Sequence, residues 1–586
     1  MQYLSKILYI LDKDRKKLPI IVILFIGVSL LDLIGLGLIG PYIALVMSPG
    51  ELSGWAADVI GFISFGFKED ELFVYIGIAI VIVFVIKVSA IILVNFIITD
   101  FSYSLQLSLR SFLMRSYQMM PYQSYLARNS AEYIHNIQNI TSQFSQNIVL
   151  VGLRVIGDMI VACAIFVMLA MVNLEALLML LILLASLIIS YNLFFRKKLA
   201  DYGFRSNKAS MALVQGIHEG VEGLKEIRIL GKSEYFYEKA KEGARNSGIY
   251  QRRLQLISLA PRYLIELLLV SFVVTLISFF LMSGFDIASM IAILSVFGVA
   301  SMRLMPIASG ISNSMSQLQF AKDSISRLYN DIYQLKTNKL DMQKYDYAYP
   351  RLSFESLEVK DIVFSYKNSS QPIVKNVSLS IKKSEIIGFI GTSGSGKTTL
   401  VDLLLGLLEP NSGDIFINHQ PIGEDLQGWR NNIAYLPQQV FLIDDTLKKN
   451  IALGCNDDEI DNDKVMLAIK NAQLLDLVKD LTSGIETMIG ERGVRLSGGQ
   501  RQRVALARSF YHERDVLIMD ESTSALDDTT EQEVIKEINQ LKGKKTMIIV
   551  AHRLTTLKSC DRIYKMDKGE IVAFGTPKEM LPQHNL

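Results

Sequence analysis

Cysteine is scarce in this sequence. Its 586 residues include only Cys163, Cys455 and Cys560, which are far apart and show neither the spacing of metal ligands nor a disulfide framework. This suits a chain whose soluble part lies in a reducing compartment. An excess of one charge is also absent, because 60 Lys and Arg oppose 58 Asp and Glu and leave a net charge of +2. No stripe of arginines with interleaved aromatics occurs either, so nothing indicates binding to nucleic acid.

Apolar residues, in contrast, are abundant and unevenly distributed. Half of the residues are hydrophobic and the mean hydropathy is +0.30, too apolar for an average soluble protein and too polar for one made only of membrane spans. A bilayer crossing takes ~20 residues of helix. Six stretches are long enough, at about 18–47, 72–99, 147–171, 174–195, 262–283 and 287–310. The first follows LDKDRKK but lacks a small-residue cleavage site, so we interpret it as a retained span rather than a secretory signal.

Basic residues predict how these spans are oriented. Lys and Arg gather in the amino-terminal arm and in the second and fourth connections, whereas the other connections hold few or none. We therefore expect the amino terminus and everything after the sixth span to lie in the cytosol. The two basic connections are long and polar, which predicts helices that extend beyond the membrane and turn near PYQSYLARNS and near GIHEGVEGLKEIRILG.

Beyond these spans the sequence predicts a soluble α/β domain. Short strands alternate with helices from about residue 351, with LEVKDIVFSY and IVKNVSLSI as early strands and EIIGFI, DVLIMDE and KTMIIVAH as buried ones. This alternation is typical of a parallel sheet with crossover helices. We predict a multi-domain membrane protein: an all-α transmembrane domain over 1–340, a linker to about 350, and a second domain over 351–586. The polar segment DIYQLKTNKLDMQKYDYAYP is assigned to the linker.

A glycine-rich loop, GTSGSGKTT at 391–399, follows the strand EIIGFI and precedes a helix. In that context glycines let successive backbone N–H groups point into one concavity, and the helix adds its positive end, so the loop suits the phosphates of ATP. Lys397 would reach the terminal phosphates and the Thr398 hydroxyl would bind Mg²⁺. The expected ATP ligands here are Gly391, Ser393, Gly394, Ser395, Gly396, Lys397, Thr398 and Thr399.

Two acids end the apolar strand DVLIMDE. A hard cation such as Mg²⁺ needs oxygen ligands, which Asp520 supplies directly or through water. Glu521 follows and is placed to orient a water for in-line attack on the γ-phosphate. Two acids at a strand end would more often form a solvated turn, but the loop upstream and STSALD downstream favour the catalytic interpretation.

A second glycine pair, in LSGGQRQR at 496–503, precedes an amphipathic helix and predicts another anion-binding helix start. One ATP within one domain has no need of two such sites. We therefore expect this stretch to bind the γ-phosphate of ATP held by a second copy of the chain.

These motifs together resemble the ATPase domain of ABC transporters, over about 230 residues, with LSGGQ as the superfamily signature. The resemblance implies that Tyr366 stacks on adenine and that Gln438 senses Mg²⁺ and the membrane domain. It also implies that Asp527 crosses the dimer and that His552 contacts the γ-phosphate. The residues expected to act in trans are Ser497, Gly498, Gly499, Gln500 and Asp527. Because the set is intact, with Glu521, His552 and Gln438 as catalytic residues, it favours a homodimer with two working sites.

The order of the domains resembles the exporter type of half-transporter, located in the bacterial inner membrane. The stretches APRYLIE and FGVASMRLMPIASGISNSMSQLQFA are similar to membrane domains of bacterial flippases for lipid-linked oligosaccharides. The resemblance implies export or flipping of a lipid-linked or amphipathic substrate. Two alternatives stay open: an exporter of peptides or drug-like amphiphiles, and an ATP-gated channel or regulator.

Ionisable residues within the spans are candidates for the substrate path, because they are costly there. Asp32, Lys87 and Arg303 are the three placed deepest. Lys87 and Arg303 would hold an anionic head group, whereas Asp32 argues against a purely anionic cargo unless it is paired. The alternative is that these residues form internal ion pairs.

Overall fold

The computed structural model describes residues 2–47, 69–282, 287–337, 352–366, 369, 371–520, 532, 536, 539–551 and 554–581. It divides into two compact units. The helical unit comprises Met1–Met120 and Arg128–Met342, and the α/β unit comprises Pro121–Ala127 and Gln343–Leu586.

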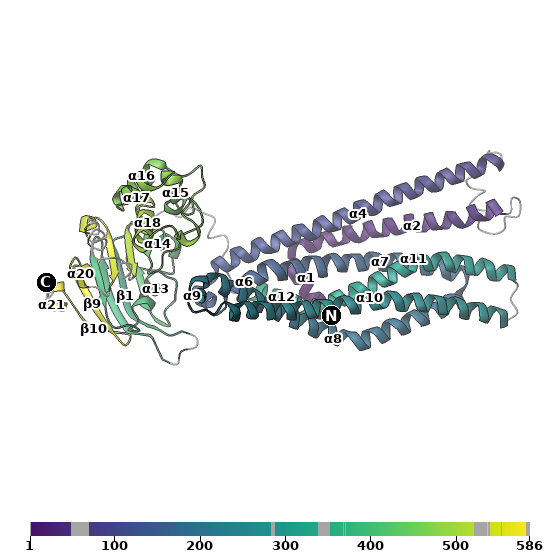
Figure 1. Ribbon diagram of the computed structural model, residues 1–586, viewed down its shortest axis with the longest axis horizontal. Coiled ribbons are helices and arrows are strands. Elements are labelled where there is room, and N and C mark those ends of the chain that lie inside the picture. The colour runs from purple at the N-terminus through teal and green to yellow at the C-terminus, as the bar shows by residue number, and fades with distance from the viewer. Residues whose placement is uncertain are drawn as a thin grey trace. The chain divides into compact units, whose positions relative to one another are not determined.

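Long helices make up most of the described helical unit (Figure 1). The expected stretches 18–47, 72–99, 174–195 and 287–310 fall within them, 147–171 begins in the preceding π-helix, and the last residue of 262–283 lies outside the described residues. These helices are α2 (Leu18–Met47), α4 (Glu69–Met119), α7 (Val151–Val172), α8 (Leu174–Glu222), α10 (Ser233–Met282) and α11 (Ile287–Phe320). Among the described residues, four helical segments are long and apolar enough to cross a membrane: Gly77–Met119, Ser130–Val172, Leu174–Glu222 and Ser233–Ser278. The stretches 18–47 and 287–310 are helical too, but some of their side chains lie outside the described set, so the count of six remains a prediction.

Shorter helices complete the unit. They are α1 (Gln2–Leu11), η1 (Asp12–Lys17), α6 (Ser130–His135), the π-helices η2 (Asn136–Ile140) and η3 (Gln143–Leu150), α9 (Leu224–Ile229) and α12 (Lys322–Thr337). The connections are helical extensions, as expected, with turns at Pro121–Ala127 and around α9.

The expected linker segment begins later than predicted. Its first seven residues, DIYQLKT, form the end of α12, so the assignment to the linker is wrong there. Buried Ile332 and Leu335 explain the difference, because they give this polar stretch an apolar face.

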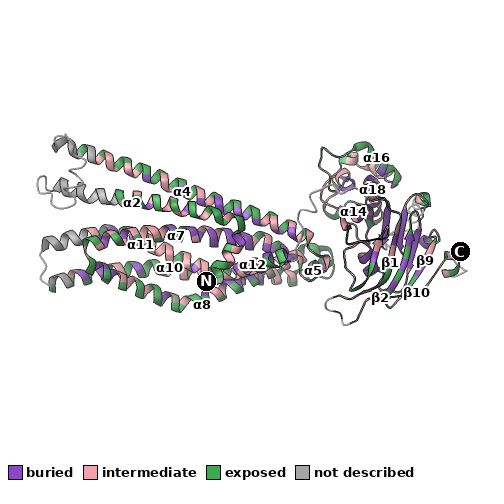
Figure 2. Ribbon diagram, turned by 180° about the vertical axis from the view of Figure 1, so that it is seen from behind, coloured by how far each residue is buried: buried purple, intermediate pink, exposed green. Residues whose placement is uncertain are grey.

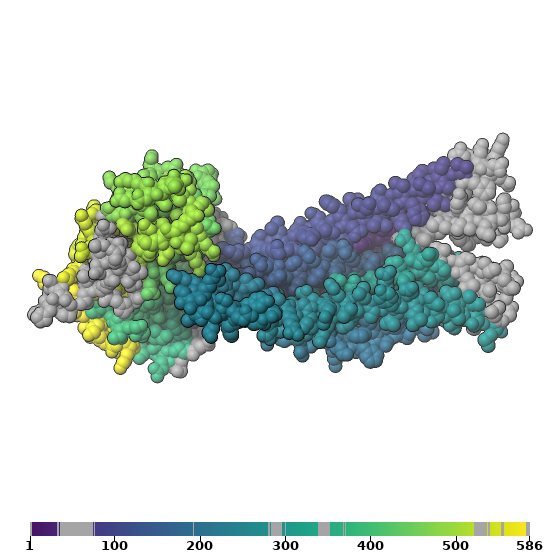
Figure 3. Space-filling view, in the orientation of Figure 1, coloured from purple at the N-terminus to yellow at the C-terminus, as the bar shows by residue number. Residues whose placement is uncertain are grey.

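Glycines bring α8 close to its neighbours. A Cβ on Gly203 would lie 1.8 Å from the carbonyl oxygen of Phe320 in α11, and one on Gly243 would lie 2.8 Å from the Leu213 nitrogen. Small residues allow backbones to approach this closely in helix pairs. The surfaces of α10 and α11 (teal) are accordingly continuous with that of α8 (blue) in the space-filling view (Figure 3).

A buried carboxylate joins α12 to the first long connection. Asp331, 6% exposed, accepts hydrogen bonds from the Tyr117 hydroxyl (2.5 Å), the Arg128 guanidinium (2.6 Å) and the Asn136 amide (2.7 Å). Arg128 also donates to Gln334 at 2.8 Å. The helix that continues from α11 is thus tied to segments about 200 residues away in sequence.

The α/β unit contains two sheets, built around buried strands (Figure 2). The six-stranded sheet has the order β10-β9-β3-β8-β7-β6, parallel except for β10. Its strands are β3 (Ile386–Ile390), β6 (Ile433–Leu436), β7 (Val516–Asp520), β8 (Thr546–Val550), β9 (Arg562–Asp567) and β10 (Glu570–Gly575). The second sheet is antiparallel, with the order β2-β1-β4-β5, and was not predicted as separate. It comprises β1 (Ser356–Phe364), β2 (Val374–Lys382), β4 (Ser412–Ile417) and β5 (Gln420–Pro421).

Alternate residues of the central strands face two different cores. In β7, Val516 and Ile518 belong to the core that contains α13 (Lys397–Leu404) and the antiparallel sheet, whereas Leu517 and Met519 belong to the core that contains α18 (Gly498–Tyr511). Since successive side chains of a strand point to opposite faces, α13 and α18 cover opposite faces of the sheet.

The other helices described in this unit are α5 (Tyr122–Leu126), α14 (Leu426–Arg430), α15 (Leu447–Ile451), α16 (Asn462–Asn471), α17 (Leu475–Asp480), α20 (Leu554–Leu557) and α21 (Pro577–Met580), with the short η5 (Gly484–Glu486) and η6 (Glu491–Gly493).

The contacts of Asp331 predict a stability loss on mutation. Asp331→Ala leaves the Arg128 guanidinium and the Tyr117 hydroxyl without their buried acceptor, which should lower the free energy of unfolding by about 3 kcal/mol. Thermal unfolding of the purified protein in detergent measures this. Asp201→Ala is the matched control, because Asp201 pairs with Arg205 at 2.8 Å on the surface, where such pairs contribute less than about 1 kcal/mol. Equal losses in the two variants would contradict the prediction.

Candidate nucleotide-binding site

The glycine-rich loop lies between β3 and α13, as the sequence predicts. At two of its glycines a side chain has no room: a Cβ on Gly391 would lie 2.3 Å from the Met566 carbonyl oxygen, and one on Gly396 would lie 2.9 Å from that of Ile373. Gly396 also has φ +98°, a left-handed conformation that glycine adopts without strain. The loop is therefore a tight backbone turn at the amino-terminal end of α13, the geometry that favours anionic ligands.

Lys397 points back into this turn. Its ammonium donates to the carbonyl oxygens of Gly391 and Thr392, at 2.9 Å each, and the residue is 6% exposed. These bonds keep a positive charge within the curve of the loop. Ser395 and Thr399 are also buried, whereas Ser393, Gly394 and Thr398 are exposed. Thr398 thus offers its hydroxyl to solvent at the first turn of α13.

Two carboxylates lie near each other beside the loop. Asp520 ends β7 and is 4% exposed, and Asp402 is on α13. Burial, and the Asp520 carboxylate next to it, raise the pKa of Asp402 to about 6. Together with the Thr398 hydroxyl these groups are hard oxygen donors of the kind that Mg²⁺ prefers, so the residues present fit this ion.

Tyr435 was not predicted as part of the site. It belongs to β6, which pairs in parallel with β7, and its phenol lies close to the Asp520 carboxylate. Partial burial raises the pKa of Tyr435, and Asp520 and Asp402 raise it further. The phenol therefore stays protonated and is placed to donate to the acid. In the sequence, only its position three residues before Gln438 could have indicated that Tyr435 belongs to the site. Its approach to Asp520 depends on the pairing of two strands, which the sequence does not show.

Aromatic side chains lie on the same side of the unit. Tyr366 packs edge-on against Phe364, with ring centroids 5.0 Å apart. Tyr122 of α5 packs against the core formed by α13 and the antiparallel sheet. Tyr366 packs against the same core. Burial raises the pKa of Tyr122, with smaller contributions from Asp402, Tyr125 and Tyr366. Gln438 is exposed in the loop after β6.

The signature stretch forms a capped helix start on the other face of the sheet. Ser497 precedes α18 and forms a capping box with Gln500: the Gln500 N–H donates to the Ser497 hydroxyl at 3.2 Å, and the Ser497 N–H donates to the Gln500 side chain at 2.8 Å. Gly498 and Gly499 form the first turn. Because α18 and α13 belong to different cores, the two helix starts are separated by the central sheet.

The other predicted site residues are described in part or not at all. Glu521, Asp527, His552 and the side chain of Asp32 lie outside the described residues. Lys87 is 2% exposed, with its ammonium 4.8 Å from the centre of the Phe84 ring, and Arg303 is half-buried in α11. All assigned roles, in the ATPase motifs and in the spans, stay predictions.

Comparison with known proteins identifies the soluble part. The family model described as ABC transporter matches residues 374–524, which include the glycine-rich loop, the signature stretch and Asp520. The α/β unit is an ABC transporter ATPase domain. Its family implies that it binds ATP.

Curated relatives match over less than half of their length. An ATP-dependent lipid A-core flippase of Ralstonia nicotianae is 40% identical over 232 residues, which are 39% of this chain and 39% of that protein. A lipid A-core flippase 2 of Colwellia psychrerythraea is 35% identical over 271 residues, 46% of this chain and 45% of that protein. The matched region thus covers about two fifths of these relatives.

Structural similarity extends much further along the chain. A bacterial Atm1-family ABC exporter, solved with ATP bound, matches 97% of this chain and 97% of its own with a TM-score of 0.73, at 20% sequence identity. The chain therefore has the fold of an ABC exporter, with its helical unit followed by the ATPase domain, as the sequence predicted.

The contact between Tyr435 and Asp520 predicts a change in metal requirement. Residues that hold a metal ligand in place typically change metal affinity by 10–100-fold when mutated, so Tyr435→Phe should raise the Mg²⁺ concentration for half-maximal ATPase activity roughly ten-fold. ATP binding measured in EDTA should stay unchanged. Tyr511→Phe is the control, since its hydroxyl accepts a hydrogen bond from the Asp461 N–H in the core of α18, the other core. An unchanged Mg²⁺ dependence in Tyr435→Phe would contradict the role.

Proposed function

We propose that this chain is one half of a homodimeric exporter that uses ATP hydrolysis to flip a lipid-linked or amphipathic substrate out of the cytosolic leaflet of the bacterial inner membrane. A lipid-linked oligosaccharide is the proposed cargo. The amino terminus and the ATPase domain are placed in the cytosol, because the basic residues gather in the arm and connections of that side.

The observation that carries the proposal is the pair of anion-binding helix starts on opposite faces of one sheet. The turn before α13 and the start of α18 each present backbone N–H groups to an anion, yet the central sheet separates them. If both act on one ATP, they must come from two copies of the chain. Two copies then enclose two such sites, which is the basis for the homodimer.

Within each site the residues have separate tasks. The turn and Lys397 bind the phosphates, and Ser497 with the first turn of α18 contributes donors from the partner copy. Thr398, Asp520 and Gln438 would hold Mg²⁺, which neutralises charge on the β- and γ-phosphates when bound. Glu521 orients the attacking water, and His552 contacts the γ-phosphate. Tyr435, whose phenol is placed to donate to Asp520, holds that carboxylate in orientation.

Coupling to the membrane is supported by α5. This short helix forms the turn of the first long connection, and its Tyr122 packs on the ATPase core beside Tyr366 and Asp402. Movement of the ATPase domain on ATP binding would therefore displace the helices on either side of α5 directly. On the two sides of α5, Tyr117 of α4 and Asn136 of η2 are in turn joined to α12 through Asp331.

Support for a lipid cargo comes from the relatives and from the spans. The curated relatives that match the ATPase region are named lipid A-core flippases. In the helical unit, Lys87 is buried in α4, and Arg303 lies half-buried in α11. Cations at such depth are costly, and they suit an anionic head group, with arginine well matched to pyrophosphate.

Glu521→Gln tests the proposal that Glu521 is the catalytic residue for ATP hydrolysis. Loss of the water-orienting carboxylate should lower ATP hydrolysis at least ~100-fold while ATP binding persists. Phosphate release and nucleotide binding measure the two effects, and the same variant serves as the blank for ATP-dependent flipping of a fluorescent lipid-linked oligosaccharide in proteoliposomes. Hydrolysis at the normal rate would refute the assignment. Normal ATPase without flipping in the native sequence would instead favour a peptide or drug-like amphiphile as cargo.

Mixed dimers test whether the sites are shared. With Lys397→Ala on one chain and Ser497→Ala on the other, a shared arrangement places both changes in one site and leaves the second intact, so ATPase activity should persist. With both changes on one chain, each site carries one defect and activity should be lost. If each chain formed its own complete site, the two results would be reversed. Tandem affinity tags on the two copies isolate each mixed dimer.

A further inference from the structure

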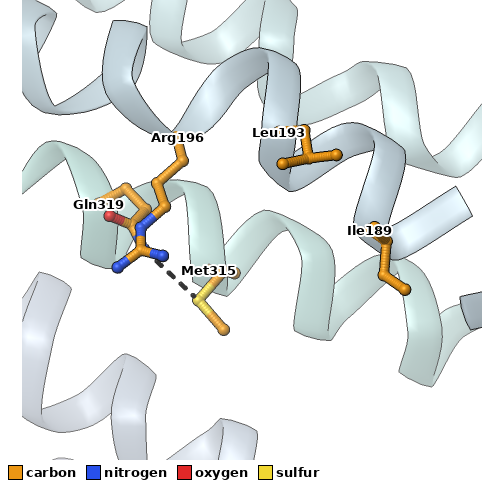
Figure 4. A pocket seen from close by; sticks show the side chains of 5 residues that line it. All are labelled: Ile189, Leu193, Arg196, Met315 and Gln319. Atoms are coloured by element: carbon orange, nitrogen blue, oxygen red, sulfur yellow. Dashed lines mark hydrogen bonds between the residues drawn. The ribbon is translucent and has the colours of Figure 1, made fainter. Parts of the chain in front are cut away.

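A groove lies between α8 and α11 near the cytosolic end of the predicted fourth span (Figure 4). Its volume is about 450 Å³, within the range of ~300–1,000 Å³ that is usual for ligand sites. Ile189, Leu193 and Arg196 line it from one face of α8, at helical spacings of four and three residues. Met315 and Gln319 line it from α11 and contact each other, with the Gln319 amide 4.0 Å from the Met315 sulfur.

The walls of the groove are fixed by contacts on either side of it. On one side the Tyr191 hydroxyl hydrogen-bonds the Ser316 hydroxyl at 2.7 Å and donates to the Ile257 carbonyl oxygen at 3.0 Å. On the other side Gly203 lets α8 approach the Phe320 backbone. The separation of α8 and α11 is thus set by buried contacts and does not depend on what fills the groove.

One cation lines the polar end of the groove, and a second begins the next helix. Arg196 is exposed on α8, and half-buried Lys322 begins α12 one turn beyond Gln319. Burial lowers the pKa of Lys322 and the charge of Arg196 lowers it further, so the two groups repel each other. The Lys322 ammonium also lies 5.1 Å from the centre of the Tyr3 ring of α1, an aromatic of the kind enriched at membrane interfaces.

No carboxylate compensates this pair among the described residues. The nearest acids in sequence are already paired elsewhere: Asp201 with Arg205 at 2.8 Å, and Asp323 with Arg327 at 2.6 Å. The groove is apolar, has Arg196 at one end, and is followed one turn beyond Gln319 by Lys322. This arrangement matches an anionic lipid whose head group lies at the interface and whose chain lies in the membrane.

We propose that this groove binds one anionic phospholipid of the inner leaflet, with its phosphate between Arg196 and Lys322 and an acyl chain along the apolar wall. The bound phosphate would relieve the repulsion between the two cations, and the Gln319 amide is placed to donate to the ester region. The site is separate from Lys87 and Arg303 and needs neither ATP nor cargo.

Binding of phosphatidylglycerol to the delipidated full-length protein in detergent, followed by native mass spectrometry, tests the proposal. We expect one tightly bound phosphatidylglycerol per chain and no comparable binding of phosphatidylcholine. Arg196→Gln with Lys322→Gln should weaken binding about thirty-fold, from the contribution of each basic residue at an anionic lipid. Lys197→Gln with Lys198→Gln removes the same charge from the same helix. It should weaken phosphatidylglycerol binding no more than about two-fold, because neither side chain lines the groove and exposed charges away from it are screened.

Two further experiments distinguish binding of a lipid from binding of any small anion and from a general effect of surface charge. Leu193→Gln keeps both cations but makes the wall polar, and should also weaken phosphatidylglycerol binding. Millimolar inorganic phosphate should not displace the lipid. Equal losses in the two double variants, or full displacement by phosphate, would overturn the proposal. Neither outcome touches the proposed transport function, because binding is measured without ATP or cargo.

Discussion

The strict alternation of side chains along β3, β7 and β8 is the constraint on which the ATPase domain depends. These strands are buried on both faces, so every residue must suit one of two cores. The helix α13 and the turn before it pack on one core, and α18 with the signature stretch packs on the other. A slip of one residue would exchange the two faces and displace both anion-binding helix starts. The separation of the two helix starts, on which the proposed homodimer rests, is therefore built into the sheet.

Local sequence patterns made many elements of the fold predictable. The glycine-rich loop, the buried strands and the helix after LSGGQ are each encoded within about ten residues of sequence, and the structure has them where they were expected. The turns near Pro121 and Gly223 were predictable for the same reason, because helix breakers interrupt otherwise continuous helical stretches. The exporter fold followed from the order of the two parts. The roles of Asp527 and His552 rest on resemblance alone, whereas that of Glu521 was also argued from its place at the end of an apolar strand.

What the sequence did not reveal depends on contacts between distant segments. The antiparallel sheet was missed because β4, which completes it, lies about fifty residues after β1 in sequence. Tyr435 comes next to Asp520 through the pairing of β6 with β7. The polar start of the expected linker is helical because Ile332 and Leu335 are buried there and Asp331 has partners in the first connection. The groove beside Arg196 likewise requires α8 and α11 to be aligned by Gly203, whose importance no local pattern indicates.

The helical unit also limits how the chain can move. Asn207 of α8 donates to Asp323 and Ser324 of α12, and Asp331 joins α12 to the first connection. Sliding α8 or α12 past its neighbours would leave these buried groups unpaired, at a cost of about 1–3 kcal/mol each. A rotation of this whole part of the helical unit breaks none of them. Since packed interfaces change between discrete arrangements rather than deforming continuously, these contacts favour movement of the unit as one body.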